Sequence, residues 1–219
     1  MPALERFPGN RDSLTNISLK RLLDLFIAIP ALLLFLPLGL LIALAIKLED
    51  GGPVFYITRR IGKNGRPMRF YKFRTMVVGA DGLKAQLLRF NERQDGPLFK
   101  MRNDPRVTGV GRLLRKHSLD EFPQMLNVLQ GSMSLVGPRP HLPEEVAAYH
   151  DGDYLRLECI PGIVGLPQIV GRNTLGFKDW VGLDLKYRRT WSLVLDLWII
   201  ARTLRIVLAP FMRSRGAGF

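Results

Sequence analysis

The sequence is poor in the side chains that form disulfides and zinc sites. Cys159 is the only cysteine in 219 residues, so no intrachain disulfide can form. A single cysteine is compatible with a reducing compartment. The three histidines, His117, His141 and His150, lack the spacing of metal ligands, so we expect them at the surface or behind a site rather than on a metal.

Acidic residues are also scarce. The chain has 19 Asp and Glu against 32 Lys and Arg, which gives a formal net charge of +13. Such an excess favours anionic partners, namely nucleic acid, anionic lipid or phosphate-rich substrates. Hydrophobic residues make up 47% of the chain, which is enough to build a core.

Common nucleotide-binding motifs are missing. No Walker A motif occurs, and "GVGRLL" (109–114) lacks the third glycine of a dinucleotide-binding loop. Asp151-Gly152-Asp153 has the D-x-D pattern of metal-dependent glycosyltransferases, but it follows "AAYH" rather than an apolar strand. We therefore assign it no metal.

What the sequence does contain is one long uncharged run, "LFIAIPALLLFLPLGLLIALAI", from Leu25 to Ile46. As a helix rising 1.5 Å per residue, this run would reach roughly 33 Å, enough to cross a bilayer core. It is longer than a signal-peptide core and no cleavage site follows it. The run predicts a retained membrane segment; a buried helix of a soluble protein is the alternative.

Prolines and flanking charges indicate how this segment enters the membrane. Pro30 and Pro37 lie inside it and would kink a helix. Basic residues flank it on both sides: Lys20, Arg21, Lys47, Arg59, Arg60, Lys63, Arg66, Arg69, Lys72 and Arg74. The positive-inside rule then places both ends on the cytoplasmic side. We expect a re-entrant helix broken at Pro37, with a straight transmembrane anchor as the alternative.

The rest of the chain is predicted to form short elements. A β-hairpin is expected over 53–76, with Asn64-Gly65 as its turn. Helices are expected over 81–94, over 119–130, over 142–158 with a break, and over 191–212. Residues 96–112 and 159–173 are expected as loop, the second with a short strand. The basic, Trp-bearing 191–212 helix would lie in a membrane interface or against the core.

Asp120 and Glu121 stand side by side in "LLRKHSLDEFPQML" (113–126). One interpretation is a helix capping box, with Ser118 as the N-cap and Glu121 at the third helical position. The other interpretation depends on the basic neighbours Arg112, Arg115, Lys116 and Arg139. Carboxylates among cations beside a membrane indicate a site for Mg²⁺ and a phosphorylated substrate. A carboxylate can also attack phosphorus and form an acyl phosphate.

Several ordered motifs together carry a family resemblance. They are "KRLLDL" (20–25), the proline-containing apolar run, "RIGKNGRPMRFYKFRTM" (60–76), "DPRVTGVGRLLRKHSLDEFPQMLNVLQGSMSLVGPRP" (104–140), "PGIVGLPQIVGRN" (161–173) and "LDLKYRRTWSLVLDLWII" (183–200). Over residues 20 to 208 the chain resembles the bacterial sugar transferases, the monotopic phosphoglycosyl transferases of glycoconjugate assembly. It departs from their common pattern at Leu36, Thr58, Ser132, Leu166, Pro167 and Val170, but it keeps the acidic pair.

The resemblance implies a reaction and a site. A sugar 1-phosphate passes from a nucleotide diphosphate sugar, usually UDP-linked, to polyprenol phosphate, through a covalent intermediate on Asp120. Glu121 is the partner carboxylate that binds Mg²⁺. The remaining positions carried over from the family are Lys72, Arg139 and Arg172 for substrate phosphate, Arg115 and Asp184 elsewhere in the active site, and Pro37 at the helix break.

The resemblance also implies an α+β fold: a mostly helical catalytic domain with a short β-hairpin, on a re-entrant membrane helix, with amphipathic interfacial helices. We expect a polar segment over 1–19, the membrane helix over 20–50, the catalytic domain over 51–187, and an amphipathic helix with a basic tail over 188–219. The domain would face the cytoplasm at the bacterial inner membrane and contact membrane lipids but no nucleic acid; a homodimer is allowed. A non-catalytic basic module that binds anionic lipid or nucleic acid is the competing hypothesis.

Overall fold

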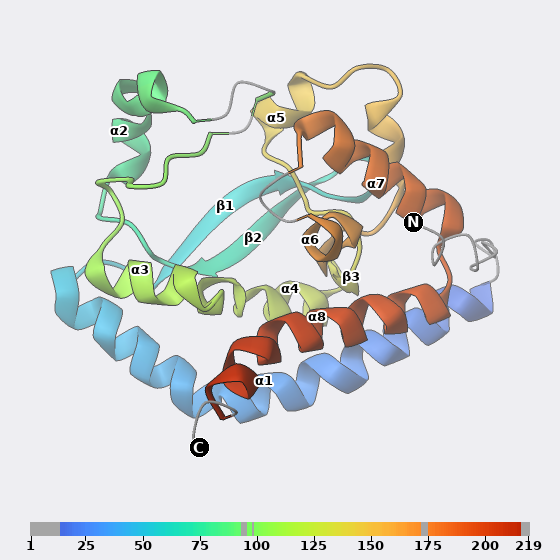
Figure 1. Cartoon of the computed structure of the whole chain (residues 1–219), viewed down its shortest axis with the longest axis horizontal. Coiled ribbons are helices and arrows are strands. Elements are labelled where there is room, and N and C mark those ends of the chain that lie inside the picture. Colours follow the sequence, from blue (N-terminus) through green and yellow to red (C-terminus); the bar gives the residue numbers. More distant parts are fainter. Residues whose placement is uncertain (1–13, 93–95, 98, 172–174, 216–219) are drawn as a thin grey trace.

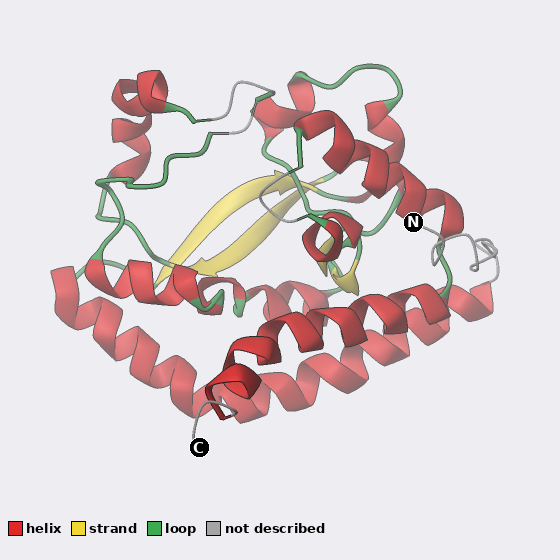
Figure 2. Ribbon diagram, in the orientation of Figure 1, coloured by secondary structure: helices red, strands yellow, loops and turns green. Residues whose placement is uncertain are grey.

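The computed structural model describes residues 14–92, 96–97, 99–171 and 175–215. Over these ranges the chain is mostly helical, with two small pairs of strands enclosed by helices (Figures 1 and 2). The elements in chain order are α1 (Leu14–Asp50), β1 (Phe55–Ile61), β2 (Pro67–Phe73), α2 (Ala80–Leu87), α3 (Gly109–Lys116), α4 (Gln124–Gln130), β3 (Ser134–Val136), α5 (Pro143–Ala147), β4 (Gly162–Val164), α6 (Leu166–Val170), α7 (Phe177–Thr190) and α8 (Leu193–Arg215).

The long apolar helix α1 forms the base of the molecule in Figure 1, where it bends between two arms. Pro30 and Pro37 lie inside it, and each removes a backbone hydrogen bond, which accounts for a bend. The helix is continuous through both prolines, so the break that the sequence predicted at Pro37 does not occur; the helix is bent instead. It also begins at Leu14, so residues 14–19, expected in the loose polar segment, are helical.

The first arm of α1 is held to the body by buried polar contacts. Lys20 Nζ donates to Asp196 Oδ2 of α8 at 2.5 Å and to the carbonyl oxygen of Val136 at 2.9 Å. Asp24 Oδ1 accepts hydrogen bonds from the Ser134 hydroxyl and the Leu135 amide of β3. These contacts fix the N-terminal arm against β3 and α8.

The second arm is held to the same body. Asp50 forms an ion pair with Arg74, whose Nη1 lies 2.7 Å from Asp50 Oδ2, and Glu49 Oε1 accepts from the Val110 amide at the start of α3. Ile42 and Ile46 pack in a cluster with Phe73 and Leu114. Both arms of α1 are therefore attached to one body.

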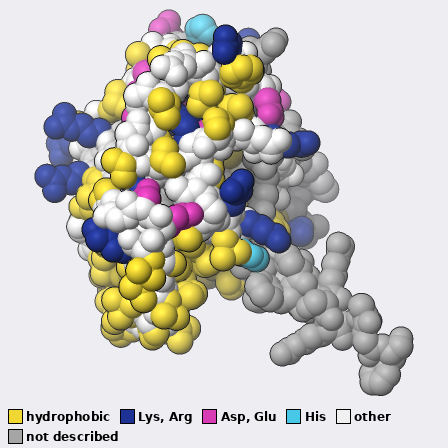
Figure 3. Space-filling model, turned by 90° about the vertical axis from the view of Figure 1, so that its left-hand side faces the viewer, with side chains coloured by type: hydrophobic (Ala, Val, Ile, Leu, Met, Phe, Trp, Pro, Cys, Tyr) yellow, Lys and Arg dark blue, Asp and Glu magenta, His cyan; other side chains and the backbone are white. Residues whose placement is uncertain are grey.

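Between these attachments α1 exposes a large apolar surface. Figure 3 shows hydrophobic side chains gathered over the lower end of the molecule, at the level of α1. The exposed side chains of the helix include Phe26, Leu33, Leu34, Leu36, Leu38, Leu40, Leu41, Leu44 and Leu48. Apolar surface of this extent beside basic flanks is typical of a membrane-binding surface.

We expect Lys20→Met to destabilise the protein. The substitution leaves the carboxylate of Asp196, which is 1% exposed, without its cation, although Tyr187 and Trp191 still donate to it. Removing one partner of a buried pair costs about 3–5 kcal/mol of unfolding free energy. Denaturant unfolding in detergent measures this loss, and Lys63→Met at an exposed position is the control. Equal stability of the two variants would contradict the prediction.

The predicted hairpin is confirmed. Strands β1 and β2 pair antiparallel from Phe55 opposite Phe73 to Ile61 opposite Pro67. Asn64 and Gly65 both have positive φ, as a tight turn requires. The amide of buried Asn127 holds β2 against α4: its Oδ1 accepts from the Tyr71 amide and its Nδ2 donates to the Arg69 carbonyl.

One loop prediction and two helix predictions were wrong at their boundaries. Residues 109–112, expected as loop, open α3, because Thr108 accepts a hydrogen bond from the Gly111 amide and caps it. The helix expected over 119–130 is a 3-10 turn, Leu119–Glu121, followed by α4 from Gln124. The helix expected over 81–94 is α2 with a 3-10 turn after it, Leu88–Phe90; residues 93–95 of that prediction lie outside the described residues.

The second half of the chain holds more structure than the sequence predicted. The expected 142–158 helix is α5 and a 3-10 turn, Asp153–Glu158. Strand β4 pairs in parallel with β3, a strand that was not predicted, and α6 lies within the expected loop over 159–173. Helix α7 was also not predicted. Helix α8 is confirmed and packs against the core.

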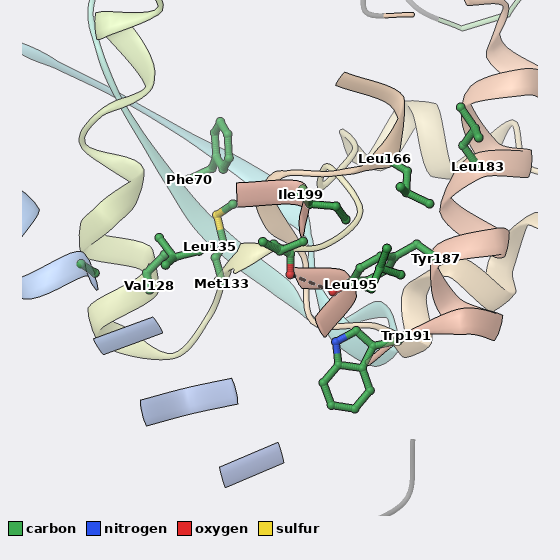
Figure 4. Packing of buried hydrophobic residues seen from close by; sticks show 12 residues of the cluster. Phe70, Val128, Met133, Leu135, Leu166, Leu183, Tyr187, Trp191, Leu195 and Ile199 are labelled. Atoms are coloured by element: carbon green, nitrogen blue, oxygen red, sulfur yellow. Dashed lines mark hydrogen bonds between the residues drawn. The ribbon is translucent and has the colours of Figure 1, made fainter. Parts of the chain in front are cut away.

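The main hydrophobic core lies between the β1–β2 hairpin, α4, β3, α7 and α8 (Figure 4). Phe70 from β2 and Val128 from α4 meet β3 and the inner faces of α7 and α8, which contribute Leu183, Leu195 and Ile199. The core therefore joins the hairpin to α7 and α8 and keeps the turn between α3 and α4 in a fixed place.

Candidate active site

The acidic pair lies on the 3-10 turn between α3 and α4. Ser118 has φ of +57°, the left-handed region, and its side chain makes no cap hydrogen bond. The capping-box interpretation is therefore wrong, because the left-handed Ser118 reverses the chain instead of opening a helix. The turn leaves Asp120 only 6% exposed and Glu121 beside it.

Two of the predicted phosphate-binding cations converge on this pair. Lys72 reaches across from β2, with its Nζ 2.7 Å from Glu121 Oε1 and 3.4 Å from Asp120 Oδ2. Arg139, which follows β3, places Nη2 2.7 Å from Glu121 Oε1 and Nη1 3.3 Å from Oε2. Four residues named from the sequence thus form one cluster.

The cations set the charge state of Glu121. Burial disfavours its ionised form, but the nearby charges of Arg139 and Lys72 outweigh burial and hold the pKa of Glu121 well below its ordinary range. Conversely, Glu121 raises the pKa of Arg139 above its ordinary value. Glu121 is therefore a carboxylate at neutral pH and available as an oxygen ligand.

Asp120 opens into a cavity of about 290 Å³. Lys72 and Arg115 line the cavity near Asp120, and Arg115 Nε donates to the Thr75 hydroxyl at 2.9 Å. At another part of the wall Tyr56 donates to the carboxylate of Asp81, and burial together with that carboxylate raises the pKa of Tyr56 to about 12. This cavity offers cations for phosphate next to polar groups for the rest of a substrate.

A buried network lies behind Arg139. Arg156 is 1% exposed; its Nη2 donates to the Arg139 carbonyl oxygen at 2.9 Å and its Nε to Asp184 Oδ2 at 2.9 Å. It also donates to the hydroxyl of Tyr149, which lies 2.7 Å from His141 Nδ1. Asp184 thus lies behind the cluster and is linked to it by Arg156, which contacts both Asp184 and the Arg139 carbonyl oxygen. Sequence reasoning missed Arg156, because acidic residues lie on both sides of it, at Asp153 and Glu158, and nothing in the local pattern distinguishes it from an exposed basic residue.

The remaining sequence predictions have mixed outcomes. Arg172 lies outside the described residues. Pro37 lies inside the bent helix α1. Phe35 of the same helix stacks on Phe122 with ring centroids 3.5 Å apart, so α1 contacts the residue that follows Glu121. Asp153 accepts from the His150 amide, a local turn contact, and no group of three candidate metal ligands occurs in the part of the chain that the structure describes.

The adjacent carboxylates fit Mg²⁺ as the resemblance implies. Mg²⁺ is commonly held by one or two carboxylates together with substrate phosphates, so three protein ligands are not needed. Asp120 and Glu121 supply ionisable oxygens, and the cavity beside Asp120 leaves room for phosphate.

Comparisons with known proteins identify the family. Residues 15–210 match the family model described as bacterial sugar transferase. The chain is 45% identical to exopolysaccharide production protein ExoY of Rhizobium meliloti, over 86% of this chain and 84% of that protein. It is 42% identical to UDP-glucose:undecaprenyl-phosphate glucose-1-phosphate transferase of Caulobacter vibrioides (84% of this chain, 68% of that protein). It is 38% identical to undecaprenyl-phosphate galactose phosphotransferase of Salmonella typhimurium (94% and 44%).

Proposed function

The chain belongs to the bacterial sugar transferase family, and from this premise we propose that it transfers a sugar 1-phosphate from a nucleotide diphosphate sugar to polyprenol phosphate. Relatives named for UDP-glucose and undecaprenyl phosphate favour a UDP-sugar as donor and undecaprenyl phosphate as acceptor. The product would be a polyprenol diphosphate sugar that initiates glycan assembly, such as exopolysaccharide.

One observation carries the proposal: a buried aspartate and an ionised glutamate share one cluster with Lys72 and Arg139, and the aspartate opens into a cavity. A phosphoryl group in transfer spreads negative charge over its oxygens, which needs fixed cations. Arginine presents a planar fork that suits those oxygens.

The proposed mechanism has two displacements at one phosphorus. The Asp120 carboxylate attacks the phosphorus that bears the sugar. The bond from this phosphorus to the oxygen of the leaving nucleotide monophosphate then breaks. An oxygen of polyprenol phosphate then attacks the same phosphorus and releases Asp120. Mg²⁺, held by Glu121 and the diphosphate, would neutralise charge on the substrate. Arg139 and Lys72 orient the phosphate, and Lys72 also contacts Asp120.

The function is tested by a panel of nucleotide sugars incubated with the full chain, Mg²⁺ and polyprenol phosphate. We expect release of nucleotide monophosphate that depends on both the right donor and the acceptor. Binding to lipid or nucleic acid that weakens steeply with salt, without monophosphate release from any donor, would support the non-catalytic hypothesis instead.

We further propose that α1 is re-entrant and that the catalytic body faces the cytoplasm at the inner membrane. Both arms of α1 bind the same body, through Lys20 and Asp24 at one end and Glu49 and Asp50 at the other. A helix crossing the bilayer would separate these ends by the roughly 30 Å hydrocarbon core, and one body could not hold both.

Cysteine labelling tests this topology. In a Cys159→Ser background, we expect Ser18→Cys and Arg66→Cys, both at exposed positions, to react with a membrane-impermeant maleimide only from the cytoplasmic side. Reaction of Ser18→Cys from the periplasmic side alone would refute the re-entrant arrangement and favour a spanning helix.

A further inference from the structure

A second cavity, of about 400 Å³, opens on the Glu121 side of the acidic pair. Its lining shares no residue with the cavity beside Asp120. The wall comes from the 3-10 turn, α4, β4, α6, α7 and α8, and it is largely apolar: Phe122, Met125, Ile163, Ile169, Trp180 and Ile206. We call this cavity the Glu121 groove. Its composition suits a hydrocarbon chain rather than a nucleotide.

Two hydrogen-bond donors in the groove have no acceptor among the residues that the structure describes. Gln168 Nε2 and Trp180 Nε1 are both buried and unpaired. The orientation of the Gln168 amide is set by its other end, because Gln168 Oε1 accepts from the Gly165 amide at 3.0 Å. A buried N–H without an acceptor costs free energy, so such a group requires an explanation, and an oxygen of a bound ligand would supply the missing acceptor. Because both groups are hydrogen-bond donors, they suit the oxygens of an anion.

The groove also lies against the helices that carry the exposed apolar surface. Thr203 and Ile206 of α8 line it, while Val194, Leu197 and Leu204 of the same helix are exposed. Phe122, another lining residue, stacks on Phe35 of α1. A lipid held in the membrane can therefore approach Glu121 from this side.

We infer that the Glu121 groove is the acceptor site and that it binds polyprenol phosphate. The apolar wall takes the isoprene units nearest the headgroup, and the N–H groups of Gln168 and Trp180 donate to the phosphate oxygens. The acceptor phosphate then lies beside Glu121, next to the phosphosugar on Asp120, while the donor uses the cavity lined by Asp120. This inference rests on the proposed function, since it assigns the second substrate of that reaction.

The two half-reactions can be measured separately, and each reports on one of the two cavities. Without acceptor, labelled nucleotide monophosphate exchanges into the nucleotide sugar through the Asp120 adduct alone, so exchange reports the donor half-reaction. With acceptor present, the dependence of the transfer rate on the concentration of polyprenol phosphate reports the acceptor half-reaction. Trp180→Phe removes one N–H and keeps an aromatic ring; Gln168→Glu keeps the acceptor for Gly165 and replaces the N–H donor with a negative charge.

We expect both variants to retain exchange within about twofold of wild type, while kcat/KM for polyprenol phosphate falls about tenfold or more, the effect of one hydrogen bond to a charged group. Thr203→Trp, which fills the groove, should act in the same way. Leu204→Trp, one residue away on the exposed face of α8, should leave both half-reactions unchanged.

Three results would overturn the inference: an equal fall of exchange and transfer, an unchanged kcat/KM for polyprenol phosphate in all three groove variants, or a loss of vesicle binding by Thr203→Trp with normal transfer kinetics. The last would make the groove a general lipid contact. If wild type shows neither exchange nor transfer with any donor, the proposed function itself fails, which is a different outcome from any of these.

Discussion

Asp120→Asn is expected to leave a folded, membrane-bound protein that transfers almost no sugar phosphate. Asparagine keeps the shape of the side chain, but its amide cannot attack phosphorus. Loss of an enzyme's nucleophile lowers turnover by several orders of magnitude, so we expect a decrease of at least about 1,000-fold. A helix cap would predict a stability loss of about 1 kcal/mol or less and normal turnover.

The contacts of Asp120 indicate that Asp120→Asn should fold normally. Ser118, not Asp120, stands at the cap position, and among the described residues the Asp120 carboxylate forms an ion pair with Lys72 alone, at 3.4 Å, so the amide should be tolerated. Glu144→Gln, at an exposed carboxylate in a 3.7 Å ion pair with Lys84, is the matched control and should be fully active. Near-normal transfer by Asp120→Asn would mean that the nucleophile is elsewhere.

Arg139→Ala is expected to produce the second large effect. It removes the guanidinium that binds both oxygens of Glu121 and that we assign to substrate phosphate. Loss of one preorganised donor typically costs about 100- to 1,000-fold in turnover, and we expect that range here in steady-state kinetics. Lys72 remains beside Glu121, so the carboxylate should stay ionised at neutral pH.

Two further variants make the Arg139 result specific. Arg139→Lys restores the charge but not the planar fork, so it should recover only part of the activity. Arg188→Ala removes a guanidinium from an exposed pair with Glu158 and should change neither turnover nor vesicle binding. If Arg139→Ala and Arg188→Ala have equal turnover, Arg139 does not contact the substrate.

Features set by neighbours in the chain were predictable from the sequence. The hairpin turn at Asn64-Gly65 depends on two residues that accept positive φ, and the amphipathic α8 on a helical repeat. The long apolar helix α1 follows from an uncharged run. The site residues Lys72, Asp120, Glu121 and Arg139 were named from family motifs; the residues alone indicated only that cations and carboxylates were near in sequence.

Features that depend on distant residues were not predictable in this way. The pairing of β3 with β4 joins segments separated by α5 and a 3-10 turn, and each strand is only three residues long. Lys20 looked like one more basic residue of a membrane flank, but it is buried against Asp196, 176 positions away. Ser118 matched a capping box because that pattern carries no information about φ.

The covalent intermediate on Asp120 is tested most directly by the mass of the intact protein after incubation with donor and Mg²⁺ in the absence of polyprenol phosphate. We predict that wild type gains the mass of one sugar phosphate, that Asp120→Asn gains nothing, and that adding polyprenol phosphate removes the adduct from wild type. Rapid transfer by wild type without any adduct, or an equal adduct on Asp120→Asn, would contradict a covalent intermediate on Asp120.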